Sequence, residues 1–201
     1  NYGLAIALCV VTMLCWGSWA NTTKLTSKGW RFELLYWDYG FGILLTTLLL
    51  AFTLGSNGSE GRAFLSDMKQ AESANLLSAF AGGVVFNLAN ILLVAAIGIA
   101  GMSVAFPVGI GIALVLGVVV NYISTPQGNP VLIFGGVALI TLAIVLNARA
   151  YQKLQTNAEG SISKKGLILS VVSGCLMGLF YKYVAGSMVT NFNVPDAGKL
   201  T

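Results

Sequence analysis

The sequence has no histidine, few charged residues and no closely spaced pair of cysteines. Charged residues make up 9% of its 201 residues and hydrophobic residues 56%, whereas a soluble domain carries about 25% charged residues. The lack of histidine excludes a histidine general base or a His-ligated zinc within these residues. Cys9, Cys15 and Cys175 lie in apolar runs, where buried free thiols are the expected state. A net charge of +4, spread along the chain, does not indicate nucleic-acid binding. These shortages predict a membrane protein without a metal or cofactor.

Six apolar runs are long enough to cross the hydrocarbon core as helices, which takes about 20 residues each. The predicted fold class is therefore all-α integral membrane, with six transmembrane helices. We expect these helices at Leu4–Ala20, Leu35–Leu54, Leu77–Ile97, Ser103–Ile123, Val131–Ala148 and Leu167–Val189.

Basic residues are concentrated on one side of these spans, seven against two. The opposite side carries mainly Arg62 and Lys69. Because basic loops stay in the cytoplasm, we expect an N-terminus outside the plasma (inner) membrane and a cytoplasmic loop 149–165. The seven are Lys24, Lys28, Arg31, Arg149, Lys153, Lys164 and Lys165.

Two apolar segments resemble each other across five predicted helices. "VVTMLCWGSWAN", Val10–Asn21, aligns without gaps with "VVSGCLMGLFYK", Val171–Lys182. An odd number of spans per repeat places the two copies in opposite orientations, as in many secondary transporters. We expect residues 1–150 to be one five-helix repeat, 151–165 a cytoplasmic linker and 166–201 the start of a second repeat. The chain would then be a fragment of a ten-helix transporter; chance similarity between apolar helices is the alternative.

A lysine lies in the sixth predicted helix, in the segment "LFYKYVAG". Ser170, Gly174, Gly178, Lys182 and Gly186 recur every four residues and share one face. Small residues on such a face let helices approach closely in a bilayer, so we expect Lys182 to point into the bundle. There it would bind substrate or take part in proton coupling. The alternative is that Lys182 snorkels to the membrane interface.

One acid, Asp38, lies against a predicted span, in "LLYWDYGFG". The neighbouring aromatic residues are typical of a membrane interface. Asp38 is therefore either a solvated carboxylate at a helix start, favoured by the local dipole, or a proton-coupling group.

Amides supply much of the remaining polarity within the spans. Asn87 and Asn90 lie on one face of the third helix and Asn21 ends the first, which suits an uncharged solute rich in amide or hydroxyl groups. Amides also cross-link helices, for about 0.6 kcal/mol each, and that is the alternative role. Pro107 removes a backbone donor in the fourth helix and leaves a carbonyl available toward a cavity.

Several segments resemble the ureide permease group of the drug/metabolite transporter superfamily. They are "GSWANTTKL", "YWDY", the run Phe86–Ile123 and "SGCLMGLF". The resemblance implies ten spans in two inverted repeats, and import of allantoin, related ureides or nucleobases with protons. Trp19, in the first segment, joins Asn21, Asn87, Asn90, Pro107 and Lys182 as a candidate substrate-binding residue. The linker 151–165 lacks the phosphate-loop-like sequence described in plant members, and "CWG" is equally similar to the sugar-uptake branch of the superfamily.

A proton-coupled importer of a small polar solute, a ureide, nucleobase or sugar, is the predicted function. The expected partners are that solute, a proton or other coupling ion and the lipid bilayer, with a homodimer as a candidate assembly. An exporter of the same superfamily, often marked by a membrane-embedded glutamate, and a structural membrane protein are the alternatives. An enzyme is not expected, because a nucleophile paired with a base or metal is missing.

Overall fold

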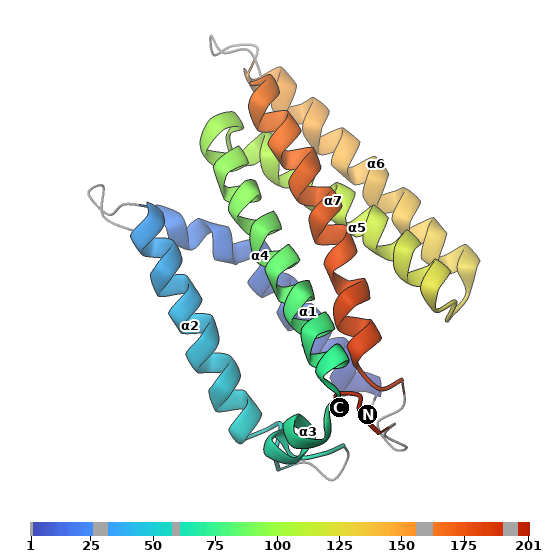
Figure 1. Ribbon diagram of the computed structural model, residues 1–201. Coiled ribbons are helices and arrows are strands. Elements are labelled where there is room, and N and C mark those ends of the chain that lie inside the picture. Colours follow the sequence, from blue (N-terminus) through green and yellow to red (C-terminus); the bar gives the residue numbers. More distant parts are fainter. Residues whose placement is uncertain (1, 26–31, 58–60, 156–162, 191–196) are drawn as a thin grey trace. The chain divides into compact units, whose positions relative to one another are not determined.

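The computed structural model describes residues 2–25, 32–57, 61–155, 163–190 and 197–201 (Figure 1). Within these ranges the chain forms helices and one isolated β-bridge, between Met188 and Leu200. Contacts between residues divide the chain into two compact units, Asn1–Gly58 and Ser59–Thr201. The predicted all-α integral membrane class is confirmed.

Unit 1 consists of helix α1 (Tyr2–Ser18), the 3-10 helix η1 (Trp19–Lys24) and helix α2 (Phe32–Phe52). Hydroxyl groups within these apolar helices bond back to their own backbone. Thr12 Oγ1 donates to Leu8 O at 2.8 Å, and Thr47 Oγ1 donates to Ile43 O at 2.8 Å. Because a polar group in lipid needs a partner, such bonds let the helices keep hydroxyls at exposed positions.

Unit 2 contains helices α3 (Phe64–Gln70), α4 (Ser73–Ala100), α5 (Met102–Ser124), α6 (Pro130–Gln155) and α7 (Lys164–Ser187). Gly101, at φ +80°, makes the tight turn between α4 and α5, a conformation that glycine adopts without strain. Pro130 starts α6, at a position where a backbone N–H would have no partner within the helix, so its absence costs nothing. Helix α7 packs along both α4 and α5, whereas α6 packs on α5 (Figure 1).

Close approach of backbones holds α7 in place. A Cβ atom added at Gly174 would lie 2.5 Å from Gly109 O, and one added at Gly178 would lie 3.1 Å from Ala113 O, both on α5. On the side of α4, Ser173 Oγ donates to Ala89 O at 2.6 Å. Small residues therefore make the helix interface, as expected in a bilayer.

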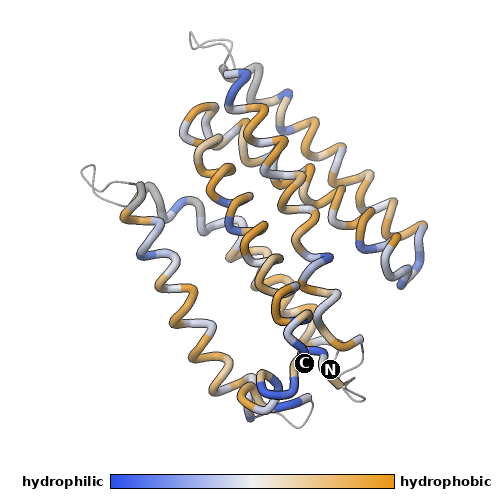
Figure 2. The backbone as a smooth tube through the Cα atoms, viewed as in Figure 1, coloured by the Kyte–Doolittle hydropathy of each residue, from blue (hydrophilic) through white to orange (hydrophobic). Residues whose placement is uncertain are grey.

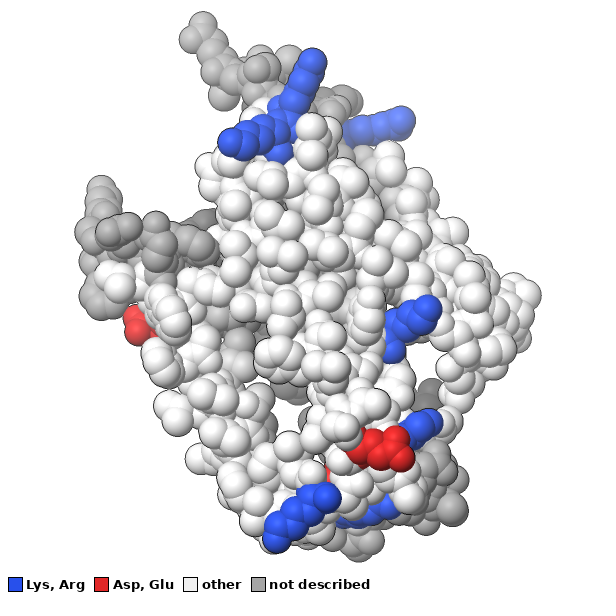
Figure 3. Space-filling view, viewed as in Figure 1, with Lys and Arg blue, Asp and Glu red and all other residues white. Residues whose placement is uncertain are grey.

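The helices of unit 2 are mainly hydrophobic along their length, and hydrophilic residues lie mostly toward the helix ends (Figure 2). On the face shown in Figure 3, its charged side chains gather mainly at two ends. The α3 end contains α3, the start of α4 and the end of α7. The Lys164 end contains the end of α4 and the start of α7. Between the two ends this face carries few charged side chains, which suits the hydrocarbon core.

Among the described residues, five helices are long and apolar enough to span a membrane: α2, α4, α5, α6 and α7. The remaining expected span, Leu4–Ala20, is displaced by two residues, because the α-helix runs from Tyr2 to Ser18 and the chain continues as η1. At 1.5 Å per residue, its 17 residues extend about 26 Å, slightly less than a typical hydrocarbon core of about 30 Å. The other five predicted spans correspond to helices whose bounds differ by a few residues. Helix α3 was not predicted.

The linker predicted at 151–165 is shortened from both sides. Helix α6 continues to Gln155 and α7 begins at Lys164, and residues 156–162 lie outside the described residues. The contact boundary between the two units falls at Gly58 and Ser59. It reflects packing rather than sequence repetition, so the division into repeats at 1–150 and 166–201 stays a prediction.

Candidate functional site

Three predicted site residues belong to unit 1, in η1 and near the start of α2. The indole ring of Trp19 stacks on the ring of Tyr39, with centroids 5.6 Å apart. Asp38 precedes Tyr39 and is exposed, and Asn21, two residues after Trp19, is also exposed. The stacking therefore brings the segment of Trp19 and Asn21 beside the segment of Asp38. An exposed carboxylate next to an aromatic pair is accessible to solvent protons or to a solute.

Asn90 occupies the middle of α4 and is only 4% exposed. Within the part of the chain that the structure describes, no hydrogen bond to the Asn90 side chain is found. In the same part of the chain, every side-chain nitrogen or oxygen that is fully shielded from solvent has a hydrogen-bond partner. The Asn90 amide must therefore retain some access to the surface. It lies one turn from Phe86 and two turns from Ile97, which both pack against the buried cluster of Ala89, Leu93 and Met177.

Asn87 lies one turn before Asn90 on α4 and is exposed. Three residues along an α-helix rotate by about 300°, so the two amides point in directions about 60° apart. The face predicted for the third helix, here α4, is therefore exposed at Asn87 and buried at Asn90. We call its exposed part the strip. Gly83 and Gly98, on the same strip, are exposed, and an added Cβ at either would meet nothing within 4 Å.

Pro107 lies inside α5 but on the side away from Asn90. A Cβ added at Gly111, one turn after Pro107, would lie 2.4 Å from Ile144 Cδ1 on α6. Gly109, rotated from Pro107 by about 200°, faces Leu93 of α4 and Ser170 of α7. Pro107 therefore shares the α6 side of α5, and unit 2 does not bring Pro107 and Asn90 to one cavity.

Lys182 lies on α7, five residues before the helix ends at Ser187. Ser170, Gly174 and Gly178 of its predicted stripe are buried, but Lys182 and Gly186 are exposed in unit 2. A rise of 1.5 Å per residue places Lys182 about 7.5 Å from the end of α7. Its neighbours Tyr181 and Tyr183 are 48% and 45% exposed, as aromatic residues near a membrane interface often are. The helices of unit 2 therefore leave the Lys182 side chain uncovered.

The predicted site residues thus fall into three places. Trp19, Asn21 and Asp38 belong to unit 1. In unit 2, Asn87, Asn90 and Lys182 lie along the antiparallel pair of α4 and α7, while Pro107 lies between α5 and α6. Asn21 and Lys182 hold equivalent positions in the aligned segments Val10–Asn21 and Val171–Lys182, so an inverted repeat predicts that they meet near its axis. The two residues belong to different units, and their meeting stays a prediction.

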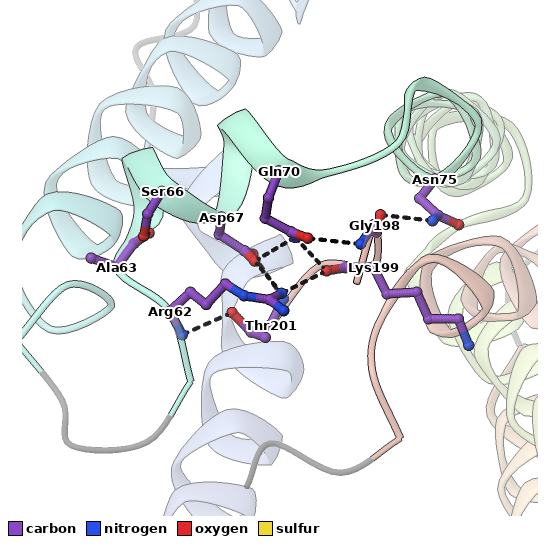
Figure 4. Close-up of polar contacts among 9 residues, drawn as sticks. All are labelled: Arg62, Ala63, Ser66, Asp67, Gln70, Asn75, Gly198, Lys199 and Thr201. Atoms are coloured by element: carbon purple, nitrogen blue, oxygen red, sulfur yellow. Dashed lines mark hydrogen bonds and ion pairs between the residues drawn. The ribbon is translucent and has the colours of Figure 1, made fainter. Parts of the chain in front are cut away.

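Sequence reasoning missed a polar cluster at the α3 end of unit 2. Asp67 of α3 is 5% exposed and pairs with Arg62, with Nη1 3.4 Å from Oδ1 (Figure 4). The pair also contacts residues after α7, more than 120 positions along the chain. A short polar helix between two apolar runs is the signal that could have indicated it.

Comparison with known proteins identifies close sequence similarity to one family. The sequence model described as ureide permease matches residues 35–186. Ureide permease 2 of Arabidopsis thaliana is 30% identical over 167 residues, which cover 81% of this chain and 41% of that protein. Probable ureide permease A3 of Vigna unguiculata is 31% identical over 149 residues, covering 72% of this chain and 40% of that protein. The chain thus spans about two fifths of the length of these relatives. No solved structure matches.

Proposed function

Because the chain belongs to the ureide permease family, we propose that it forms part of a secondary transporter that imports a ureide or nucleobase across the plasma membrane. Its relatives are ureide permeases by name, and five of its helices are suited to span a bilayer. Sugar-like solutes are the related substrate class. Alternating access, with the site open to each side in turn, is the proposed mechanism.

The single observation that carries the proposal is the Asn90 amide. It is held in the middle of an apolar span, almost fully buried, and no hydrogen bond to its side chain is found among the described residues. Because its polar atoms keep some access to the surface, a solute that enters from there can bind to them. An amide offers two donor hydrogens and an acceptor oxygen, and a ureide presents the complementary N–H and C=O groups. Bound solute would therefore satisfy the amide, and Asn87 would add a second polar contact one turn away.

Asp38 is proposed as the proton-coupling group. It is exposed beside the Trp19–Tyr39 stack, so it can exchange protons with water while the aromatic rings bind a planar solute. Protonation would remove its negative charge before the carboxyl group moves into a less polar environment. Lys182 is proposed to assist from α7, by holding a solute carbonyl or compensating a coupling carboxylate as it loses its proton.

The proposed orientation places the Lys164 end in the cytoplasm. Arg149, Lys164 and Lys165 gather there, whereas the α3 end mixes basic residues with Asp67 and Glu72. The positive-inside rule then puts the α3 end outside. Lys69→Cys and Lys164→Cys, each in a background without the native cysteines, test this. A thiol reagent that does not cross membranes should label position 69 in intact cells and not position 164; the reverse pattern overturns the orientation.

Uptake by membrane vesicles tests the proposed function. Vesicles containing the full-length protein should accumulate radiolabelled allantoin or uracil when the pH is lower outside than inside. Glucose tests the sugar alternative in the same preparation. If none of the three enters above the level of empty vesicles, the import proposal is wrong.

A further inference from the structure

The residues after α7 are fastened to the connection between α2 and α4. The strap, residues Gly198–Thr201, lies against α3 and the start of α4 (Figure 4). Gly198 N donates to Gln70 Oε1 at 2.7 Å, and Gln70 Nε2 donates to Lys199 O at 2.7 Å. Asn75 Nδ2, from the first turn of α4, donates to Gly198 O at 2.8 Å. Two side-chain amides therefore hold the strap through its backbone.

Asp67 lies at the centre of this arrangement. Its Oδ2 accepts a hydrogen bond from Thr201 N at 2.8 Å, and its Oδ1 accepts one from Gln70 Nε2 at 3.1 Å. Arg62 Nη1 lies 3.4 Å from Asp67 Oδ1 and 3.3 Å from Lys199 O. Hydrogen bonds to an ionised group are stronger than neutral ones, and the 5% exposure of Asp67 limits competition from water. We call Arg62, Asp67, Gln70, Asn75 and the strap the clasp.

The clasp also holds the end of α7. Val189 N donates to Leu200 O at 2.8 Å, and Leu200 N donates to Ser187 O at 2.9 Å, so the strap continues into a parallel bridge with the residues that end α7. The start of α4 is tied to α7 directly, since Ser78 Oγ donates to Tyr183 O at 2.8 Å. The strap thus connects α3, α4 and α7 at one end of unit 2.

The strap is shaped to fit its site. Gly198 has a φ of +84°, and a Cβ atom added there would lie 2.7 Å from Glu72 Cγ. Glu72 N also donates to Gly198 O at 2.8 Å. A left-handed backbone in such close contact requires glycine. This fit distinguishes the strap from a connection that rests loosely on the surface.

The opposite end of the same helix pair is joined differently. At the Lys164 end, Gly166 of α7 packs against Ala100 of α4, where an added Cβ would lie 2.5 Å from Ala100 Cβ. This is a van der Waals contact between small apolar groups, which slide or separate at low cost. The α4–α7 pair is therefore fastened by several directional bonds at its α3 end, by the hydrogen bond from Ser173 to Ala89 O along its length, and by packing at its Lys164 end.

We propose that the clasp is a permanent joint, which stays closed throughout the transport cycle and keeps the α3 ends of α4 and α7 together. Relative movement of these two helices is then confined to the Lys164 end. This inference rests on the proposed function for its transport consequence, whereas the joint itself can be tested without transport.

A covalent lock across the clasp tests the transport consequence. A Cβ atom added at Gly61 would lie 3.5 Å from Thr201 Cβ, at the short end of the range of about 3.5–4.5 Å found in disulfides. The variant Gly61→Cys/Thr201→Cys, in a background without the native cysteines, is oxidised or reduced before allantoin uptake is measured. The uptake rates of the oxidised and reduced samples should agree within about twofold, because a disulfide across a joint that does not open changes no step of the transport cycle. Loss of uptake on oxidation, with recovery on reduction, would overturn the proposal.

Hydrogen exchange tests the joint in the unmodified protein, since Gly61, at φ +78°, could disfavour cysteine. The amides of Gly198, Leu200 and Thr201 all donate in the clasp and should exchange slowly, both with and without allantoin. If allantoin makes all three strap amides exchange fast, the joint opens during transport and the proposal is wrong.

A pair of variants separates this proposal from the proposed function. Asp67→Ala removes the acceptor of Thr201 N and should speed exchange at all three strap amides. Glu72→Gln is the matched control, because glutamine keeps the shape of the side chain that lies against Gly198, and the hydrogen bond from Glu72 to the strap is made by its backbone. If Asp67→Ala leaves the strap amides as protected as the control does, the clasp is not a joint, whether or not the protein transports a ureide.

Discussion

Replacing Gly174 with alanine should destabilise the packing of α7 against α5. The new Cβ atom would lie 2.5 Å from Gly109 O and 2.9 Å from Ile112 Cβ. The first neighbour is backbone, so the two helices have to separate rather than repack a flexible side chain. Overpacking of this kind costs about 1–3 kcal/mol. Alanine also gains about 1 kcal/mol of helix propensity over glycine, which offsets part of that loss.

Gly186→Ala is the matched control on the same helix. An added Cβ at Gly186 meets nothing within 4 Å, so this variant gains helix propensity without a clash. The two variants should therefore differ in the free energy of unfolding by about 1–3 kcal/mol. With about 2–4 °C per kcal/mol for a chain of this size, Gly174→Ala should melt about 2–12 °C below Gly186→Ala.

Thermal unfolding of the purified protein in detergent, followed by circular dichroism, measures the difference. Equal melting temperatures for the two variants would refute the close contact of α7 with α5. Such a result would also remove the support for the central position of α7 in unit 2.

Three predictions concern the proposed transport. Asn87→Ala should reduce allantoin uptake several-fold without lowering the amount of protein in the vesicles, as judged by immunoblot. Normal uptake by this variant would leave helix cross-linking as the role of Asn87. Asp38→Asn keeps the shape of the side chain but cannot carry a proton, so it should abolish uphill accumulation and keep downhill exchange. Unchanged accumulation with the same pH profile would exclude proton coupling through Asp38. Lys182→Met should abolish accumulation with little loss of expression, and Lys182→Arg should be partly tolerated. Transport by Lys182→Met at the parent rate would show that Lys182 only anchors α7 at the interface.

The periodicity of the sequence predicted the buried face of α7 in part. Ser170, Gly174 and Gly178 are buried, because a four-residue spacing of small side chains gives a flat surface that neighbouring backbones can reach. The same spacing continues to Lys182 and Gly186, yet both are exposed in unit 2. Periodicity shows which residues share a face but not how far along the helix a neighbour covers it.

The position of Pro107 shows a second limit. Pro107 shares a side of α5 with Gly111, one turn later, and its place in the sequence does not show that α6 covers this side. The choice between neighbours depends on side-chain fit, here Ile144 against Gly111, which spacing does not encode. The predicted grouping of Pro107 with Asn90 is therefore not found in unit 2.

The clasp depends on contacts between residues far apart in the chain. Arg62 and Thr201 are joined across 139 positions, and helix α3 has only 7 residues, too few for a clear helical pattern. The end of α1 is also set locally, where the apolar run gives way to the more polar segment Trp19–Lys24 and the chain tightens into η1. Local pattern thus predicted the long spans, whereas tertiary contacts determine the connections.

Allantoin binding to purified Asn90→Ala tests the central claim most directly. Asn147→Ala is the matched control, because Asn147 is an exposed amide on α6. If bound ureide satisfies the Asn90 amide, loss of that partner should raise the Kd by about tenfold, which corresponds to about 1.4 kcal/mol. Asn147→Ala should bind allantoin like the parent. Equal Kd values for the parent and a folded Asn90→Ala would contradict a ureide site at Asn90.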